Sequence, residues 1–342
     1  MTGFWRVEKA GIAVVTDLGR TAGPTFGLAA NGALDQYSAQ VANILVANDP
    51  NAPLVELTAT GLTLRAYAEM LIAVTGAEVA CTINGVPRPT WQPVPVARGD
   101  VVELGAMTRG LRAYLSVHGS LDAPYLLGSC ALDTVIGFGL RLRAGDEFAL
   151  RRALPSAVNP HLGVSLFDFP TARPALAEVA TIDVTDGPDI AEFGPAATTV
   201  FGTPYTVSPV SNHIGLRLGG GPVPRRVSSG EILSRAVPIG AVEAPPGDEL
   251  LVLHRGRGVT AGYPVLGVVT STSLDTLAQV RPGQQVRFRH TDVRTAIDRK
   301  RGEHRRILAL ADRVGNAFTS LGIDASQLAH ALDHPLSTTV RN

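Results

Sequence analysis

The chain has 342 residues, of which 45% are hydrophobic and 18% charged, and its formal net charge is zero. A length above about 250–300 residues favours two domains, and this composition excludes long disordered tracts. The sequence has no basic run and no interleaved aromatic stripe, so it lacks the electrostatic footprint of nucleic-acid binding.

Cysteine content and the first residues bear on location. Cys81 and Cys130 are too few for a disulfide framework and form no zinc-type cluster, so we expect a reducing, cytoplasmic location and no metal site. The chain starts with the charged residues Arg6, Glu8 and Lys9 and has no run of about 18 apolar residues. Neither a signal peptide nor a membrane span is therefore expected.

The first part of the chain, from Gly11 to about residue 150, is a series of short strand-like runs separated by turn residues. The clearest runs are Ile12–Thr16, Leu62–Arg65, Met70–Thr75, Val79–Ile83 and Val101–Leu104. One segment differs, because Asp35–Val46 spaces its apolar residues as a helix does and Asp35 suits the N-cap position. The sequence predicts a β-rich unit with one helix.

Four prolines between residues 151 and 178 break the strand rhythm and predict a connection there. Strand-like runs then resume, at Thr181–Thr185, Thr206–Val210, Gly215–Leu218, Leu250–Leu253, Gly267–Thr270 and Val286–Arg289. Residues 293–321 predict an amphipathic helix, and residues 325–332 a second, short one. We interpret the long helix as packed on its own barrel in preference to a partner-binding element.

Most motifs of enzyme chemistry are absent. The sequence has no GxxxxGK[ST] phosphate loop, no GxSxG elbow, no HExxH and no Ala-Met-Lys-Met biotin site. The run Gly219–Pro222 precedes arginines instead of a helix, so it is interpreted as a loop and not as an anion site. Any ATP or biotin chemistry is therefore expected from another chain.

Asp17, Gly19 and Arg20 end the N-terminal strand-like run with an acid, a flexible residue and an arginine. Such a set can bind a carboxylate or orient a carbonyl group. A capped turn with a surface ion pair explains the same residues equally well, because exposed pairs are common.

The segment from Arg255 to Pro264 is a glycine-rich loop that displays Arg257, Thr260 and Tyr263 between two strand-like runs. Its arginines can hold a planar carboxylate, and the phenol can donate to a developing oxyanion. We prefer a functional interpretation here. For His118 and His213, which lie among turn residues, a structural hydrogen-bonding role is preferred over catalysis.

These segments resemble, in order, the biotin-dependent carboxyltransferase family, whose members are also described as allophanate hydrolase subunit 2, as KipA-like, or as the C subunit of 5-oxoprolinase. The resemblance covers about residues 11 to 288. It rests on Val14–Arg20, Gly32–Asp35, Glu56, Thr75–Ala77, Arg112–Val117, Leu127–Ser129, Tyr205–Ser208, Gly215–Leu218, Glu231–Ser234, Gly262–Pro264 and Leu277–Gly283.

The resemblance implies a mainly β fold, with cyclophilin-like β-barrels over residues 1–160 and 161–290 and a helical extension over 291–342. It implies a KipI-like partner (the B subunit, or subunit 1) in a heterodimer or heterotetramer, and a third, LamB-like subunit. Such assemblies open 5-oxoproline to glutamate with ATP, or act in allophanate hydrolase and urea carboxylase chemistry. The chain is thus expected to be a hydrolase subunit, inactive alone, that uses ATP through the complex and carries no biotin itself.

On the matching positions, the resemblance and the residue chemistry together single out eight site residues. Tyr263 or Asp17 is the candidate for proton transfer. The catalytic candidates are Asp17, Arg257 and Tyr263, and the substrate-binding candidates are Arg20, Asn212, His213, Thr260 and Gly262.

Several polar positions of the family pattern are replaced. Cys130-Ala131-Leu132 stands where relatives have Arg-Ser-Thr, and Asn212-His213-Ile214 where they have Asp-Arg-Met. These losses favour the alternative function, a non-catalytic KipA-like regulatory subunit that binds a KipI-like protein. ATP turnover stimulated by a small amide in the complete complex separates the two.

Overall fold

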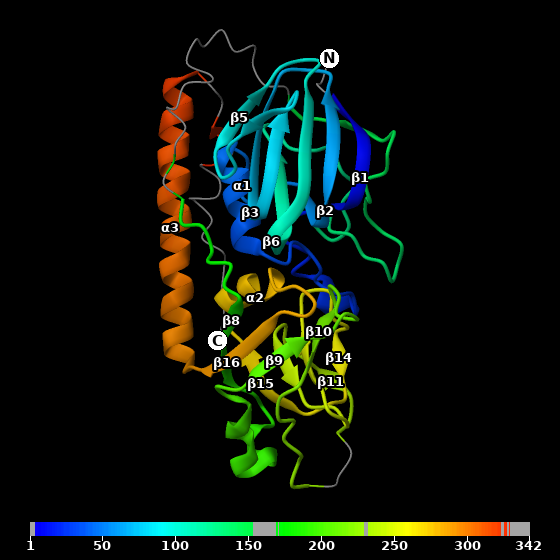
Figure 1. Ribbon diagram of the computed structural model, residues 1–342, viewed down its shortest axis with the longest axis vertical. Coiled ribbons are helices and arrows are strands. Elements are labelled where there is room, and N and C mark those ends of the chain that lie inside the picture. Colours follow the sequence, from blue (N-terminus) through cyan, green and yellow to red (C-terminus); the bar gives the residue numbers. More distant parts are fainter. Residues whose placement is uncertain are drawn as a thin grey trace.

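The computed structural model describes residues 4–152, 169, 171–228, 232–322, 325, 326 and 328. Two β-rich units follow one another along the long axis of the molecule, and one long helix runs beside both (Figure 1). None of the helices formed by the described residues is long and apolar enough to cross a membrane.

The first unit is one seven-stranded antiparallel sheet with β4 and β7 at its two ends, in the order β4-β3-β6-β2-β1-β7, where β5 also pairs with β3. Apolar side chains from these strands form its core. The strands are β1 (Phe4–Thr16), β2 (Leu54–Ala66), β3 (Met70–Ile83), β4 (Val86–Arg88), β5 (Pro93–Val96), β6 (Val101–Val117) and β7 (Glu147–Ala149).

The two predicted runs at residues 70–75 and 79–83 are halves of one strand, β3. Gly76 separates them with a φ of 87°, and the register against β6 shifts directly after it. A Cβ at this position would lie 2.4 Å from the carbonyl oxygen of Arg112, so the strand needs a glycine here. The turn signal in the sequence marks a bulge and not a strand end.

Helix α1 (Gln36–Leu45) lies against the first sheet and confirms the helix predicted from its periodicity. Asp35 is its N-cap, since Oδ1 of Asp35 accepts a hydrogen bond from the backbone N–H of Ser38 at 2.9 Å. A short 3₁₀ helix, η1 (Gly23–Phe26), precedes it.

The second unit is a closed barrel in the order β10-β13-β12-β15-β8-β16-β9. A separate ribbon pairs β11 (Arg235–Ala236) with β14 (Thr260–Ala261), and η3 (Ile190–Val200) follows β8. The barrel strands are β8 (Val179–Asp186), β9 (Pro204–Val207), β10 (Gly215–Gly219), β12 (Ala241–Glu243), β13 (Leu250–Leu253), β15 (Val265–Val269) and β16 (Gln285–His290). Helix α2 (Ser271–Ala278), which sequence patterning did not predict, joins β15 to β16.

The prediction of a mainly β protein with few helices and a helical C-terminal extension is confirmed, and a closed barrel lies within residues 161–290. Over residues 1–160, the resemblance implies another barrel. The strands there form the seven-stranded sheet described above, which has β4 and β7 at its ends. The predicted connection at residues 151–178 and the short helix at 325–332 lie mostly outside the described residues.

Helix α3 (Val293–Ser320) starts directly after the barrel and packs on both units, against α2 and β8 of the second and α1 of the first. Its buried residues, among them Ile307, Leu310 and Val314, share a core with Val41 and Ile44 of α1. The interpretation that this helix packs on its own barrel holds for part of the helix, which contacts α2 and β8 and pairs Arg299 with Asp183 of β8, but the helix also packs on the first unit. The helix runs beside both units (Figure 1), and its contacts with α1, α2 and β8 join them.

Candidate functional site

Asp17 directly follows β1, is 1% exposed, and has both carboxylate oxygens engaged. Oδ1 accepts hydrogen bonds from the N–H of Gly19 at 2.8 Å and from Oγ of Ser129 at 2.6 Å. Oδ2 accepts from the N–H of Cys130 at 2.8 Å. Asp17 therefore holds the segment at residues 129–130 against the end of β1.

Arg20 is fully buried, so the interpretation as a surface ion pair is wrong. Its Nη1 forms an ion pair with Oδ2 of Asp133 at 3.2 Å, and its Nη2 donates to the carbonyl oxygen of Ala131 at 2.6 Å. Nδ2 of Asn31 donates to the same Asp133 oxygen at 2.9 Å. Asp17 and Arg20 thus shape the segment from Ser129 to Asp133, and Nε of Arg20 is the one nitrogen of its guanidinium group without a hydrogen-bond partner among the described residues.

A cavity of about 780 Å³ lies beside this segment on the first unit. The loop at residues 132–141 and the edge strand β7 form its walls. Its charged lining residues are Asp122, Asp133, Arg141, Arg143, Asp146 and Glu147. Asp17 and Arg20 act at a distance from this space, by fixing one wall of it.

His213 lies on the exposed loop before β10 and faces the first unit. Desolvation of its partly enclosed ring lowers the pKa, and the positive charges of Arg112 and Arg141 lower it further, against the opposing charges of Glu56 and Asp133. All four charged residues belong to the first unit. His213 therefore stands at the junction of the two units, within the electrostatic reach of Asp133 and Arg141 in the cavity wall.

Arg257 is close to His213 in the folded chain. The N–H of Gly256 donates to the carbonyl oxygen of His213 at 3.1 Å, and a Cβ on Gly256 would lie 2.5 Å from the His213 ring. Arg257 is 7% exposed, and burial lowers its pKa. In the part of the chain that the structure describes, its Nε and Nη1 have no hydrogen-bond partner, an arrangement that is costly unless an acceptor arrives.

The remaining predicted residues lie at the surface of the second unit. Tyr263 is 45% exposed, Thr260 is exposed in the ribbon strand β14, and Gly262 packs against Ser234. Oδ1 of Asn212 accepts from the N–H of Ile214, which shapes the His213 loop. Among the described residues, no hydrogen bond or ion pair joins any of these predicted residues to Asp17 or Arg20.

Asn31, which sequence analysis did not single out, connects the two groups. Its backbone N–H donates to the carbonyl oxygen of Arg255 at 3.0 Å, while its side chain holds Asp133. The loop that carries Arg257 is thereby tied to the segment that Asp17 and Arg20 shape. The structure thus assembles the predicted motifs around one junction, through a residue between them.

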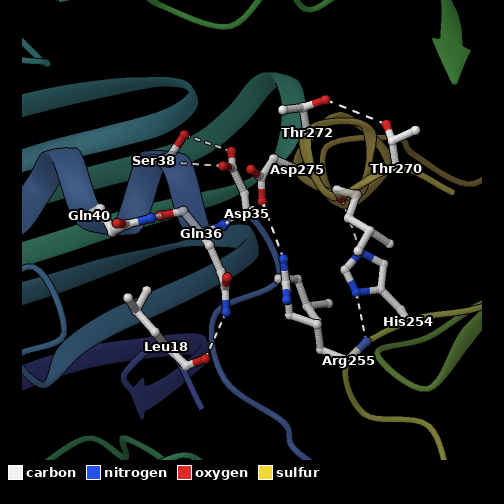
Figure 2. A network of polar contacts seen from close by, with 12 residues as sticks. Leu18, Asp35, Gln36, Ser38, Gln40, His254, Arg255, Thr270, Thr272 and Asp275 are labelled. Carbon is white, nitrogen blue, oxygen red and sulfur yellow. Dashed lines mark hydrogen bonds and ion pairs between the residues drawn. The ribbon is translucent and has the colours of Figure 1, made fainter. Parts of the chain in front are cut away.

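A buried polar network joins the first unit to helix α2 and to the loop that carries Arg255 (Figure 2). The N–H of Gln36 donates to Oδ1 of Asp275 at 2.8 Å, and Nη2 of Arg255 lies 3.7 Å from the same oxygen. Burial and the nearby charge of Asp35 raise the pKa of Asp275 to about 7. His254 stays neutral, since burial lowers its pKa and its ring nitrogens contact Leu274 O and Arg255 N.

Glu56 and Arg112 form the wall of the first unit that His213 faces. Oε2 of Glu56 accepts from the N–H of Leu34 at 3.0 Å and from the hydroxyl of Tyr114 at 2.8 Å, and Oε1 lies 3.6 Å from Nε of Arg112. Sequence analysis did not select Glu56 and Arg112 as site residues. Their position in segments that match the family was the only sequence feature that pointed to them. His118, by contrast, is a structural residue, with Nδ1 2.7 Å from the carbonyl oxygen of Val46.

A family model described as carboxyltransferase domain, subdomain A and B, matches residues 26–290. The chain is 29% identical to the C subunit of 5-oxoprolinase from Escherichia coli (strain K12) over 317 residues, which cover 91% of this chain and 99% of that protein. It is 31% identical to urea amidolyase of Lachancea kluyveri over 86% of this chain, but spans only 17% of that protein.

Two solved structures have similar folds. The K. lactis urea amidolyase gives a TM-score of 0.80 at 28% identity, over 91% of this chain and 20% of that one. The protein TTHA0988 gives a TM-score of 0.75 at 31% identity, over 84% of this chain and 55% of that one. In both, the matching region is part of a longer polypeptide.

Proposed function

Because this chain belongs to the carboxyltransferase domain family, subdomains A and B, we propose that it is a subunit of an ATP-dependent enzyme that processes small amides. The type that we favour is the C subunit of 5-oxoprolinase, which would place the chain in the opening of 5-oxoproline to glutamate. The observation that carries this choice is coverage: the chain matches the E. coli subunit over 99% of its length, but only 17% of a urea amidolyase.

Lactam opening adds water across one amide C–N bond, and negative charge develops on the amide oxygen. The unpaired Nε–H and Nη1–H groups of Arg257 are suited to accept that oxygen as a partner. Tyr263 is the candidate for proton transfer, since its phenol is exposed on the same loop. Asp17 and Arg20 are positioning residues in this proposal, because their polar groups hold the segment at residues 129–133.

His213, Asn212, Thr260 and Gly262 stay proposed substrate-binding residues. Their support is unequal: His213 faces charged residues of the first unit, whereas Thr260 lies on the β11–β14 ribbon and Gly262 directly follows it. Direct tests of Thr260 and Gly262 therefore rank after tests of Arg257 and His213.

ATP and the partner chains complete the proposal. The chain has no phosphate loop and no biotin-attachment motif, so ATP is assigned to the complex and any biotin to another chain. A KipI-like protein and a LamB-like protein are the proposed partners, in a cytoplasmic assembly. The longer chains of K. lactis urea amidolyase and TTHA0988 support the idea that further sequence complements this region.

Reconstitution with these partner proteins tests the function. We expect ATP hydrolysis that depends on added 5-oxoproline, and we expect Arg257→Ala to lower its kcat by roughly 100- to 1000-fold, the usual effect of removing an oxyanion donor. Arg217→Ala, an exposed arginine of the same barrel, is the control. Unchanged turnover in the Arg257 variant would contradict the site, and an inactive wild-type complex would contradict the substrate.

The alternative is the KipA-like regulatory subunit. It is favoured by the replacement of family polar residues at positions 130–132 and 212–214. Under this alternative the complex with a KipI-like protein forms, but no small amide stimulates ATP turnover.

A further inference from the structure

Arg141 and Arg143 line the 780 Å³ cavity and are not among the residues proposed for the reaction. Leu142 between them is 4% exposed and belongs to the core of the first unit. Side chains alternate along extended chain, so the two arginines project together away from that core. Their segment is held to β1, because the N–H of Leu142 donates to Ala13 O at 3.0 Å and that of Val15 to Leu140 O at 2.9 Å.

Both guanidinium groups are available to a ligand. Arg141 and Arg143 are exposed, and within the described residues neither side chain has a hydrogen-bond or ion-pair partner. They sit on a backbone that is hydrogen-bonded to a strand, so the pair is presented at a fixed spacing of about 7 Å along the segment.

Most acids of the cavity are already engaged. Oδ1 of Asp133 accepts from the N–H of Val135 at 3.0 Å, and its Oδ2 is held by Arg20. Oδ2 of Asp146 accepts from the backbone N–H of Arg143 at 2.7 Å, and Asp122 lies 3.6 Å from Arg151. The backbone N–H leaves the charge of Asp146 in place, so among the described residues Arg141 and Arg143 face two carboxylates without a cationic partner, Asp146 and Glu147.

We propose that Arg141 and Arg143 bind the carboxylate of a small carboxylated amide in this cavity, an inference that rests on the proposed function. Two guanidinium groups suit a planar carboxylate, and the volume lies within the range of small-molecule pockets. The charge of Arg141 acts on His213, whose carbonyl oxygen contacts the loop of Arg257.

The test uses the reconstituted complex and the variants Arg141→Ala, Arg143→Ala and the double variant. For 5-oxoproline we expect KM to rise roughly 10- to 100-fold in each single variant, with kcat at saturation within about threefold. Lysine at either position should restore part of the loss. Arg98→Ala, an exposed arginine of the same unit, is the matched control.

The lactam 2-pyrrolidinone, which is 5-oxoproline without its carboxylate, gives a second readout. We expect the wild-type complex to use it poorly and the double variant to use it no worse. A double variant with unchanged KM for 5-oxoproline overturns the inference, even if the complex is an active 5-oxoprolinase. Turnover of 2-pyrrolidinone that is lower in the double variant than in the wild type also overturns the inference.

If the complex does not turn over 5-oxoproline, the proposed function fails, and the cavity is tested by calorimetric binding of 5-oxoproline to the complex. Binding that the double variant loses supports the inference. No binding to the wild type, or equal binding to the double variant, overturns it.

Discussion

The side chain of Gln279 pairs with the backbone of Arg112 in both directions. Its Oε1 accepts the Arg112 N–H at 3.0 Å, and its Nε2 donates to the Arg112 carbonyl oxygen at 3.0 Å. Gln279 belongs to the barrel unit and Arg112 to strand β6 of the first sheet. The same amide also accepts from the N–H of Leu111 at 3.0 Å and donates to Oδ2 of Asp35 at 2.7 Å. One side chain of the barrel unit thus provides hydrogen-bond partners for buried polar groups of the first unit.

Gln279→Met should destabilise the chain by roughly 2–4 kcal/mol, because a side chain of similar size leaves the amides of Leu111 and Arg112 without an acceptor. Urea unfolding measures this loss. Gln285→Met, at an exposed position of β16, is the control and should cost less than about 0.5 kcal/mol. A loss of unfolding free energy no larger than that of the control would mean that the contact between the two units does not depend on this amide.

Arg20→Met should cost roughly 3–5 kcal/mol, since it leaves the buried carboxylate of Asp133 without its cation. The segment at residues 129–133 should also become more sensitive to limited proteolysis. Arg217→Met removes an exposed arginine 3.5 Å from Glu249 and should cost at most about 1 kcal/mol. Equal effects of the two substitutions would refute a positioning role for Arg20.

Glu243 in β12 predicts a pH dependence. It is 1% exposed, its Oε1 has no partner among the described residues, and burial raises its pKa from 4.5 to about 7. The folded chain keeps a proton that the unfolded chain releases, so this residue makes stability fall as the pH rises from about 4.5 to 7, with no further change above.

Glu243→Gln should remove this dependence. We expect the variant to be more stable than the wild type at pH 8, by up to roughly 3 kcal/mol, and close to the wild type at about pH 4.5. Urea unfolding across this pH range measures the difference, and Glu69→Gln at an exposed position is the control. A difference that does not change with pH would show that the carboxyl group is not protonated in the folded chain.

Leu310→Ala tests the attachment of α3 to the first unit. Leu310 is 4% exposed in the core that α3 shares with α1, so its truncation should cost about 2–5 kcal/mol. Arg305→Ala on the exposed face of the same helix should be nearly neutral. If the two variants unfold alike in urea, the helix is not held by this apolar face.

Much of the fold and part of the site were predictable from local sequence. Helix α1 with its Asp35 cap, most barrel strands and α3 follow from periodicity and capping, which act within a few residues. Motifs matched in order along the chain identified the family and drew attention to Asp17, Arg20 and Arg257. These signals are carried by neighbours in the chain, so they are readable without a structure.

Tertiary structure decided what those residues touch. Arg20 meets Asp133 across 113 residues, and Gln36 meets Asp275 across 239, so neither pairing has a local sequence signature. Packing turned Asp17 and Arg20 into supports for a cavity wall, and made Asn31 one of the links between the units. It also placed Arg141 and Arg143 on one side of an extended segment, without side-chain partners among the described residues. Contacts of this kind depend on how two units bury their surfaces against each other, which chain order alone does not specify.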